Sequence, residues 1–143
     1  MRIIAGAAKG RPISAVASAT RPTSDRAREA LFSTLASEFG EFDGLRVLDL
    51  YAGTGAIALE ALSRGAAIVH AVEKDEAAAK AISTNYESIK SAQFDGTFHL
   101  YSMGAHRFLS DKSQYQYHFI YIDPPYSYLL SLPRRRFPSV QGI

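Results

Sequence analysis

From residue 46 onward, short apolar segments alternate with segments of helical character. The apolar segments cover residues 46–51, 67–72, 97–101 and 117–122, and the helical ones cover residues 56–64, 76–90 and 105–109. This alternation is typical of right-handed βαβ units, whose parallel strands form a sheet with helices on its faces. The sequence therefore predicts an α/β fold built on a mostly parallel sheet.

The segment before residue 46 has a different pattern and a strongly basic character. Residues 2–5 and 13–17 are expected to be short strands joined by a turn that carries glycine and lysine. Residues 1–28 contain six basic residues and one acidic residue, a net charge of +5, whereas the rest of the chain sums to −3. Such an arm on a slightly acidic body favours contact with nucleic-acid phosphates over a merely solvated N-terminus.

A helix is predicted to follow this arm. Thr23 or Ser24 can cap its N-terminus, and Asp25 in its first turn suits the helix dipole. Two adjoining apolar stripes extend it to about residue 39, namely Ala27, Leu31 and Leu35 on one and Phe32, Ala36 and Phe39 on the other. The expected organisation is an arm (1–22), a domain (23–126) and an atypical basic tail (127–143).

Bulk properties limit the classes of function. The chain has 143 residues, of which 47% are hydrophobic and 21% charged, and this composition suits one soluble globular domain. It contains no cysteine, so disulfides, a thiolate nucleophile and a thiolate metal site are excluded. No stretch predicts a signal peptide or a membrane span, and we expect a cytoplasmic protein without a membrane partner.

The first predicted strand leads into a glycine-containing loop, residues 49–55, with the sequence DLYAGTG. Two glycines between a strand and a helix let the backbone approach a ligand closely, next to unpaired N–H groups of the helix. In dinucleotide-binding enzymes the ligand is a pyrophosphate, which the carboxylate of Asp49 would repel. The same carboxylate would attract the ammonium or sulfonium group of S-adenosylmethionine.

Glu73 supports this interpretation of the loop. It lies at the end of the second predicted strand, about 20 residues beyond the loop, where an acidic side chain can bind both hydroxyls of a ribose. A simple chain reversal at the glycines and a helix-capping role for Glu73 are the alternatives for each motif taken alone. Their occurrence together favours a cofactor site.

The fourth predicted strand ends in the motif Asp123-Pro124-Pro125-Tyr126. A carboxylate and a proline carbonyl can accept hydrogen bonds from an exocyclic amino group, because proline has no N–H and a fixed φ that can aim its carbonyl. The tyrosine ring can stack on a base. A plain turn is the alternative, since aspartate and proline both favour turns. Together with the glycine loop and Glu73, the motif indicates a site that grips a planar amino group.

In these motifs the chain resembles the class I S-adenosylmethionine-dependent methyltransferases. Among them it is similar to the bacterial RsmD type, which methylates N2 of a guanine in 16S ribosomal RNA. The resemblance extends over residues 1 to about 127 and also rests on residues 2–6, 9–11, 21–32, 59–65 and 72–75. The arginine-proline-threonine segment at residues 21–23 is far more specific to the family than the glycine loop.

The resemblance implies a Rossmann-like fold with helices on both faces of the sheet and S-adenosylmethionine as the cofactor. It implies 16S rRNA, or a small-subunit assembly particle, as the partner of a monomer without a metal ion. The implied cofactor-binding residues are Asp49, Ala52, Gly53, Gly55, Glu73, Lys74, Gly104 and Ala105. The implied guanine-binding catalytic residues are Asp123, Pro124 and Tyr126, and the implied RNA contacts are Arg2, Lys9, Arg11, Arg21, Thr23 and Arg26.

The chain departs from the family pattern in two places. Family members usually carry a polar side chain near the adenine, in the segment that matches residues 103–105. Gly104 cannot provide one, so adenine recognition is expected to rest on backbone or packing. Residues 127–143 do not resemble the family, in which several more strands follow. We therefore expect the C-terminal strands to be absent and the fourth strand to become an exposed apolar edge.

Two alternatives to methylation of a guanine in rRNA follow from the sequence. An adenine-N6 methyltransferase acting on DNA can use the same acid-proline-proline-aromatic motif. A non-catalytic RNA-binding remnant is the alternative suggested by the missing strands.

Overall fold

The computed structural model describes residues 1–15, 23–111 and 116–125 of the chain. In chain order the elements are α1 (Asp25–Phe39), β1 (Arg46–Asp49), α2 (Ala56–Ser63), β2 (Ile68–Val72), α3 (Glu76–Ile89), the 3-10 turn η1 (Lys90–Ala92), β3 (Thr97–Tyr101), α4 (Ala105–Ser110) and β4 (Phe119–Tyr121). The predicted alternation of strands and helices after residue 46 is therefore confirmed. The main differences are that β1 ends at Asp49 and that β4 is limited to residues 119–121.

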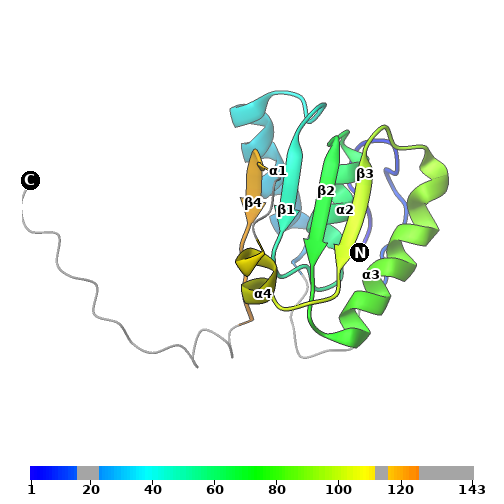
Figure 1. Cartoon of the computed structure of the whole chain (residues 1–143). Helices are drawn as coiled ribbons and strands as arrows, with labels where there is room; N and C mark the ends of the chain where they lie inside the picture. Colours follow the sequence, from blue (N-terminus) through cyan, green and yellow to red (C-terminus); the bar gives the residue numbers. More distant parts are fainter. Residues whose placement is uncertain (16–22, 112–115, 126–143) are drawn as a thin grey trace, which may run out of the picture.

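The four strands form one parallel sheet in the order β3-β2-β1-β4, side by side as Figure 1 shows. The chain adds β2 and β3 on one side of β1 and then crosses back to place β4 on the other side. The strand order thus reverses between β1 and β4. In open α/β sheets, ligands bind outside the carboxyl ends of the strands at such a reversal.

The two faces of the sheet are covered unequally. One face packs against α1, α2, α3 and the N-terminal arm, and its strand residues include Val47, Val69 and Ala71, all fully buried. The other face has a smaller cluster around Leu48 and Val72, against which α4 places Ala105 and Phe108. Helices therefore lie on both faces, as predicted, with most of the core on the α2 side.

Side chains cap the two long helices at their N-termini. Ser24 Oγ accepts a hydrogen bond from the N–H of Ala27 at 3.1 Å, which confirms the serine as the cap of α1. Asp75 Oδ2 accepts from the N–H of Ala78 at 2.9 Å at the start of α3. Such caps satisfy N–H groups that the first turn of a helix leaves unpaired.

The predicted apolar face of α1 is only partly correct. Phe32 and Leu35 are buried, but Ala27 and Phe39 are exposed. Arg28 of α1 is also fully buried. Its charge is tolerated there because its side chain forms an ion pair with Glu60 of α2. A charged side chain thus occupies a place that hydrophobic periodicity assigns to an apolar residue.

The predicted strands 2–5 and 13–17 are wrong as strands in the described residues. The arm forms a single antiparallel bridge between Arg2 and Pro12. Around it, the N–H of Ile3 donates to the carbonyl of Arg11, and the N–H of Ile13 donates to that of Met1. Residues 16 and 17 lie outside the described ranges. The arm is folded, because Ile3, Ala8 and Ile13 are buried in the main core.

β4 lies at the edge of the sheet and is not a buried strand. Ile120 of β4 is 45% exposed, and Ile122, just after the end of β4, is 62% exposed. Within the described part of the chain β4 pairs with β1 alone, and these two isoleucines are exposed. No helix in these ranges has the length and apolar character needed to cross a bilayer.

Candidate active site

The glycine loop and the Asp-Pro-Pro motif lie next to each other because β1 and β4 are paired. Asp49 at the end of β1 is in register with Tyr121 at the end of β4. The N–H of Leu50 donates to the carbonyl of Tyr121 at 3.1 Å, so the main-chain pairing continues past the strand into the loop. Asp123 follows two residues later. The two predicted halves of the site therefore meet where the strand order reverses.

The glycine loop adopts a conformation that favours glycine. Gly53 has φ = 57° and Gly55 has φ = 82°, both in the left-handed region. A Cβ atom on Gly55 would lie 3.2 Å from the Cγ atoms of Ile82 on α3, whereas one on Gly53 would meet nothing within 4 Å. The loop thus packs closely on α3 at Gly55 and is open at Gly53, where a ligand can approach the backbone.

Glu73 binds the glycine loop directly. Its Oε1 accepts a hydrogen bond from the N–H of Gly53 at 2.9 Å, and its Oε2 accepts from the N–H of Asp75 at 3.0 Å. The alternative role of Glu73 as the cap of the next helix is wrong, because Asp75 caps α3. Since each carboxylate oxygen has more than one lone pair, Glu73 can still accept hydrogen bonds from a ligand.

Asp49 is a buried carboxyl group at the centre of the site. The residue is 1% exposed, and its Oδ1 has no hydrogen-bond partner. Burial raises its pKa from 3.8 to about 7, backbone N–H groups of Tyr51 and Ala58 oppose the rise, and the charges of Glu73 and Asp123 add to it. A cationic ligand beside Asp49 would favour the charged form by direct attraction and so oppose the effects of burial and of the two neighbouring acids.

The acceptor half of the site contains one residue that the sequence patterns did not single out. The hydroxyl of Tyr121 hydrogen-bonds with the side chains of Thr23 and Asp123. Partial burial, and then the charge of Asp123, raise the pKa of this hydroxyl. Thr23, which the resemblance assigned to RNA contact, therefore lies against the acceptor motif. Arg21 and Tyr126 lie outside the described residues.

The remaining residues implied to bind the cofactor differ in burial and in their contacts. Ala52 is buried, and its N–H donates to the carbonyl of Val72 at 3.0 Å, which ties the loop to the end of β2. Lys74 is exposed. Gly104 precedes α4, where a Cβ would meet nothing within 4 Å, and Ala105 is buried in the smaller core cluster. Among the described residues, no hydrogen bond or ion pair links Lys74, Gly104 or Ala105 to Asp49, Glu73 or Asp123.

The basic residues of the arm and of the first turn of α1 divide into structural and exposed groups. Arg28 is fully buried, so it cannot contribute to a phosphate-binding surface. Arg11 donates to Ser91 Oγ at 2.8 Å, and Arg2 donates to the carbonyl of Gly10 at 2.9 Å. Lys9, Arg26 and the exposed side chain of Arg2 remain on the surface.

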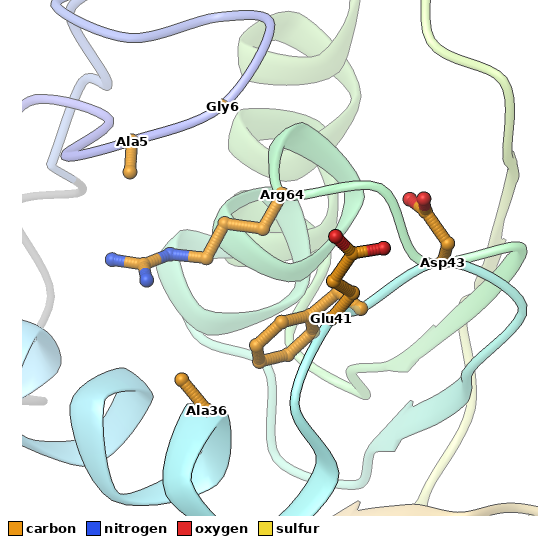
Figure 2. A pocket seen from close by; sticks show the side chains of 7 residues that line it. Ala5, Gly6, Ala36, Glu41, Asp43 and Arg64 are labelled. Atoms are coloured by element: carbon orange, nitrogen blue, oxygen red, sulfur yellow. The ribbon is translucent and has the colours of Figure 1, made fainter.

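A separate pocket lies at the opposite edge of the sheet, near the amino ends of the strands. It has a volume of about 400 Å³ and is lined by Ala5, Gly6, Ala36, Glu41, Phe42, Asp43 and Arg64 (Figure 2). The guanidinium of Arg64 lies 4.7 Å from the ring centroid of Phe32 and ion-pairs with Glu60. This pocket contains none of the predicted site residues.

Acidic residues at the carboxyl edge do not form a metal site in the described ranges. No group of three histidine or acidic side chains there is arranged to hold a metal ion. Asp49 instead lies in a negative region in which the charges of Glu73 and Asp123 raise its pKa.

Comparisons with known proteins agree with this geometry. A family model described as Conserved hypothetical protein 95, the RsmD family, matches residues 1–134. The chain belongs to this family. The fold of the RsmD-family chain is accordingly that of a Rossmann-like class I methyltransferase.

Individual relatives support the assignment. YlbH of Bacillus subtilis (strain 168), described as a candidate rRNA methyltransferase, is 39% identical over 129 residues, which are 88% of this chain and 67% of that protein. Ribosomal RNA small subunit methyltransferase D of Escherichia coli (strain K12) is 35% identical over 127 residues, 88% of this chain and 60% of that protein. The RsmD-family chain thus spans about two thirds or less of the length of these relatives.

A solved structure has the same arrangement of elements. The Escherichia coli protein yhhF, described as a candidate methyltransferase, superposes with a TM-score of 0.71 at 34% sequence identity. The superposition covers 87% of this chain and 64% of that structure.

Arg28, Glu60 and Asn85 are among the buried polar residues that the sequence patterns did not single out. Arg28 and Glu60 form an ion pair in the core, and Asn85 of α3 donates to the carbonyl of Thr54 in the glycine loop. A signal for Glu60 exists in the sequence, since it is a charged residue in an otherwise almost wholly apolar helical segment. Asn85 has no comparable signal, because a polar residue in an amphipathic helix is ordinarily assigned to the solvent side.

Proposed function

We propose that this chain transfers a methyl group from S-adenosylmethionine to the exocyclic N2 amino group of a guanine in 16S rRNA. The observation that carries the proposal is the pairing of β1 with β4, because it brings the glycine loop (residues 49–55) next to Asp123. Membership of the RsmD family and relatives named as rRNA methyltransferases support it.

The residues around Asp49 fit S-adenosylmethionine. A buried carboxyl oxygen without a partner suits a cationic ammonium or sulfonium neighbour, and Glu73 suits the two ribose hydroxyls. The open backbone at Gly53 leaves room for the ligand. Bound there, the cofactor would supply an electrophilic methyl group.

The acceptor chemistry needs orientation and no strong base. Asp123 and the carbonyl of Pro124 would accept hydrogen bonds from the N2 hydrogens, which directs the nitrogen lone pair toward the methyl group. S-adenosylmethionine held by Asp49 and Glu73 would supply the methyl group and would leave as S-adenosylhomocysteine. The nitrogen would release its proton to solvent only after methylation, because it becomes acidic only once methylated. Proximity and alignment would supply most of the rate enhancement.

The target guanine must leave its stack to reach this site, as in other base-modifying enzymes. Tyr126, outside the described residues, is proposed to stack on the extracted base. Lys9, Arg2 and Arg26 are proposed to contact RNA phosphates, since exposed cations supply sequence-independent affinity.

Two substitutions separate the halves of the site. Asp123→Ala should abolish methyl transfer and leave S-adenosylhomocysteine affinity, measured by calorimetric titration, nearly unchanged. Glu73→Ala should weaken that affinity, whereas Glu76→Ala, an exposed neighbour in the first turn of α3, should not. Full activity in Asp123→Ala would exclude the proposed role of this carboxylate.

The substrate class is tested by incorporation of tritiated methyl groups. Small-subunit particles, protein-free 16S rRNA and adenine-containing duplex DNA would be compared under one condition. We expect label in guanine of the RNA or particle. Label in DNA adenine would support the N6-methyltransferase instead, and a chain that binds RNA but no cofactor would support the non-catalytic alternative.

A further inference from the structure

Asn85 is a buried amide on α3 that lies beneath the glycine loop. The residue is 2% exposed, and both ends of its side chain are bonded to backbone. Its Nδ2 donates to the carbonyl of Thr54 at 3.0 Å and to the carbonyl of Ser14 at 3.1 Å. Its Oδ1 accepts from the N–H of Ser14 at 2.9 Å. One side chain therefore bonds two segments that are far apart in the sequence.

The bond to Thr54 restrains the part of the loop that would face the cofactor. Thr54 stands between Gly53 and Gly55, and glycine has more conformational freedom than any other residue. Gly55 already rests on Ile82, one turn before Asn85 on the same helix. The amide and this apolar contact together fix the loop on α3 at two points.

The bonds to Ser14 restrain the N-terminal arm in the same place. Ser14 exchanges two hydrogen bonds with the amide, which fixes both its N–H and its carbonyl. Ile13 beside it is buried in the main core, and Arg11 donates to Ser91 of η1, just beyond the end of α3. The arm thus lies along α3, and its contact nearest to the cofactor loop is made through Asn85.

We propose that Asn85 is a positioning residue that couples the N-terminal arm to the cofactor loop. Displacement of Ser14 would remove two of the three hydrogen bonds that orient the amide and so loosen its hold on Thr54. By linkage, a ligand that orders the loop must also stabilise the docked arm. The inference rests on the proposed function, because it takes the loop as the site of S-adenosylmethionine.

Two substitutions at this position distinguish a hydrogen-bonding role from simple filling of space. Asn85→Ala removes all three bonds. Asn85→Asp has nearly the same shape and keeps an acceptor for the N–H of Ser14, but it places a carboxylate oxygen against two carbonyl oxygens. We expect both variants to weaken S-adenosylhomocysteine binding about tenfold, as loss of a buried hydrogen bond implies. In turnover, KM for S-adenosylmethionine should rise while kcat stays within about twofold.

Ile89→Ala is the matched control. Ile89 is fully buried on the same helix, one turn beyond Asn85, and is not bonded to the loop or to Ser14. It should lower thermal stability without changing the affinity for S-adenosylhomocysteine. Wild-type affinity in Asn85→Asp would overturn the proposal, and so would an equal loss of affinity in Ile89→Ala.

Hydrogen exchange tests the coupling itself in the ligand-free and ligand-bound protein. Without ligand, Asn85→Ala should speed exchange at the amides of both Ser14 and Gly55. Added S-adenosylhomocysteine should slow both amides in the wild type but only that of Gly55 in the variant. If the ligand fails to bind the wild type, the proposed function fails. The comparison of wild type with Asn85→Ala without ligand still tests the role of Asn85 in that case. If exchange at the Gly55 amide is the same in both proteins, Asn85 does not restrain the loop.

Discussion

Arg28 and Glu60 form an ion pair inside the core, with Arg28 Nε 3.6 Å from Glu60 Oε1 and neither side chain exposed. Glu60 also accepts hydrogen bonds from the backbone N–H groups of Ile4, at 2.8 Å, and Ala5, at 3.4 Å. Arg28 donates in turn to the carbonyl of Arg2. One buried pair thus joins α1, α2 and the arm.

We predict that Arg28→Met lowers the free energy of unfolding by up to roughly 3–5 kcal/mol, because it removes the fully buried partner of Glu60 and leaves only Arg64 to compensate the buried carboxylate. Urea unfolding followed by circular dichroism measures the effect. Adding Glu60→Gln to Arg28→Met should recover part of the loss, since no buried charge then remains at either position. Arg26→Met on the exposed side of α1 is the control and should change stability by less than about 0.5 kcal/mol. Equal effects at the two arginines would contradict the buried pair.

The arm offers a second comparison, between two glycines with nearly the same backbone conformation. Gly6 has φ = 88° and Gly10 has φ = 83°. A Cβ on Gly6 would lie 1.9 Å from the carbonyl oxygen of Ser63, whereas one on Gly10 would meet nothing within 4 Å. Gly10→Ala should therefore cost about 1–2 kcal/mol of left-handed strain, and Gly6→Ala should cost clearly more. Thermal unfolding of the pair measures the difference, and similar melting temperatures would show that the arm does not pack closely on α2.

A third prediction concerns pH and Asp49. Its folded-state pKa of about 7 lies above the ordinary value of 3.8, so the folded protein holds a proton in this interval that the unfolded chain has lost. The contribution of Asp49 to stability is therefore present at low pH and is lost as pH rises toward 7. A cation bound beside Asp49 would lower its pKa, so cofactor binding at or just below neutral pH should release a proton and strengthen as pH rises.

Calorimetric titration with S-adenosylhomocysteine and S-adenosylmethionine checks this prediction. In buffers of different ionisation enthalpy, the apparent binding enthalpies should differ by the amount that release of about half a proton at pH 7, and of nearly one proton about one pH unit lower, implies. The difference should disappear in Asp49→Asn. Proton release that persists in this variant would assign the titrating group elsewhere.

The parts of the fold that follow from hydrophobic periodicity were predictable from the sequence. The strands after residue 46 and the helices between them appear within a few residues of their expected positions. The proximity of Glu73 to Gly53 was also predictable from the sequence, because the carboxyl ends of neighbouring parallel strands meet at one edge of the sheet.

Other features depend on tertiary contacts that a linear pattern does not contain. Arg28 lies on the buried side of an amphipathic helix only because Glu60, on another helix, compensates its charge. The arm lacks the predicted strands because its backbone groups bond instead to Glu60, Ser63 and Asn85. Tyr121 joins the site because β4 pairs with β1, which no local signal in its own segment reveals.

The pairing of β1 with β4 has a consequence for how such a site can change over time. Its two halves are 74 positions apart in the chain (49 and 123), yet the spacing between them depends on main-chain hydrogen bonds such as that from Leu50 to Tyr121. Backbone bonds of this kind survive almost any replacement of side chains. Substitutions after β4 can therefore change which group accepts the methyl. The distance between that group and the loop after β1 then stays the same, because the backbone bonds that set it are kept.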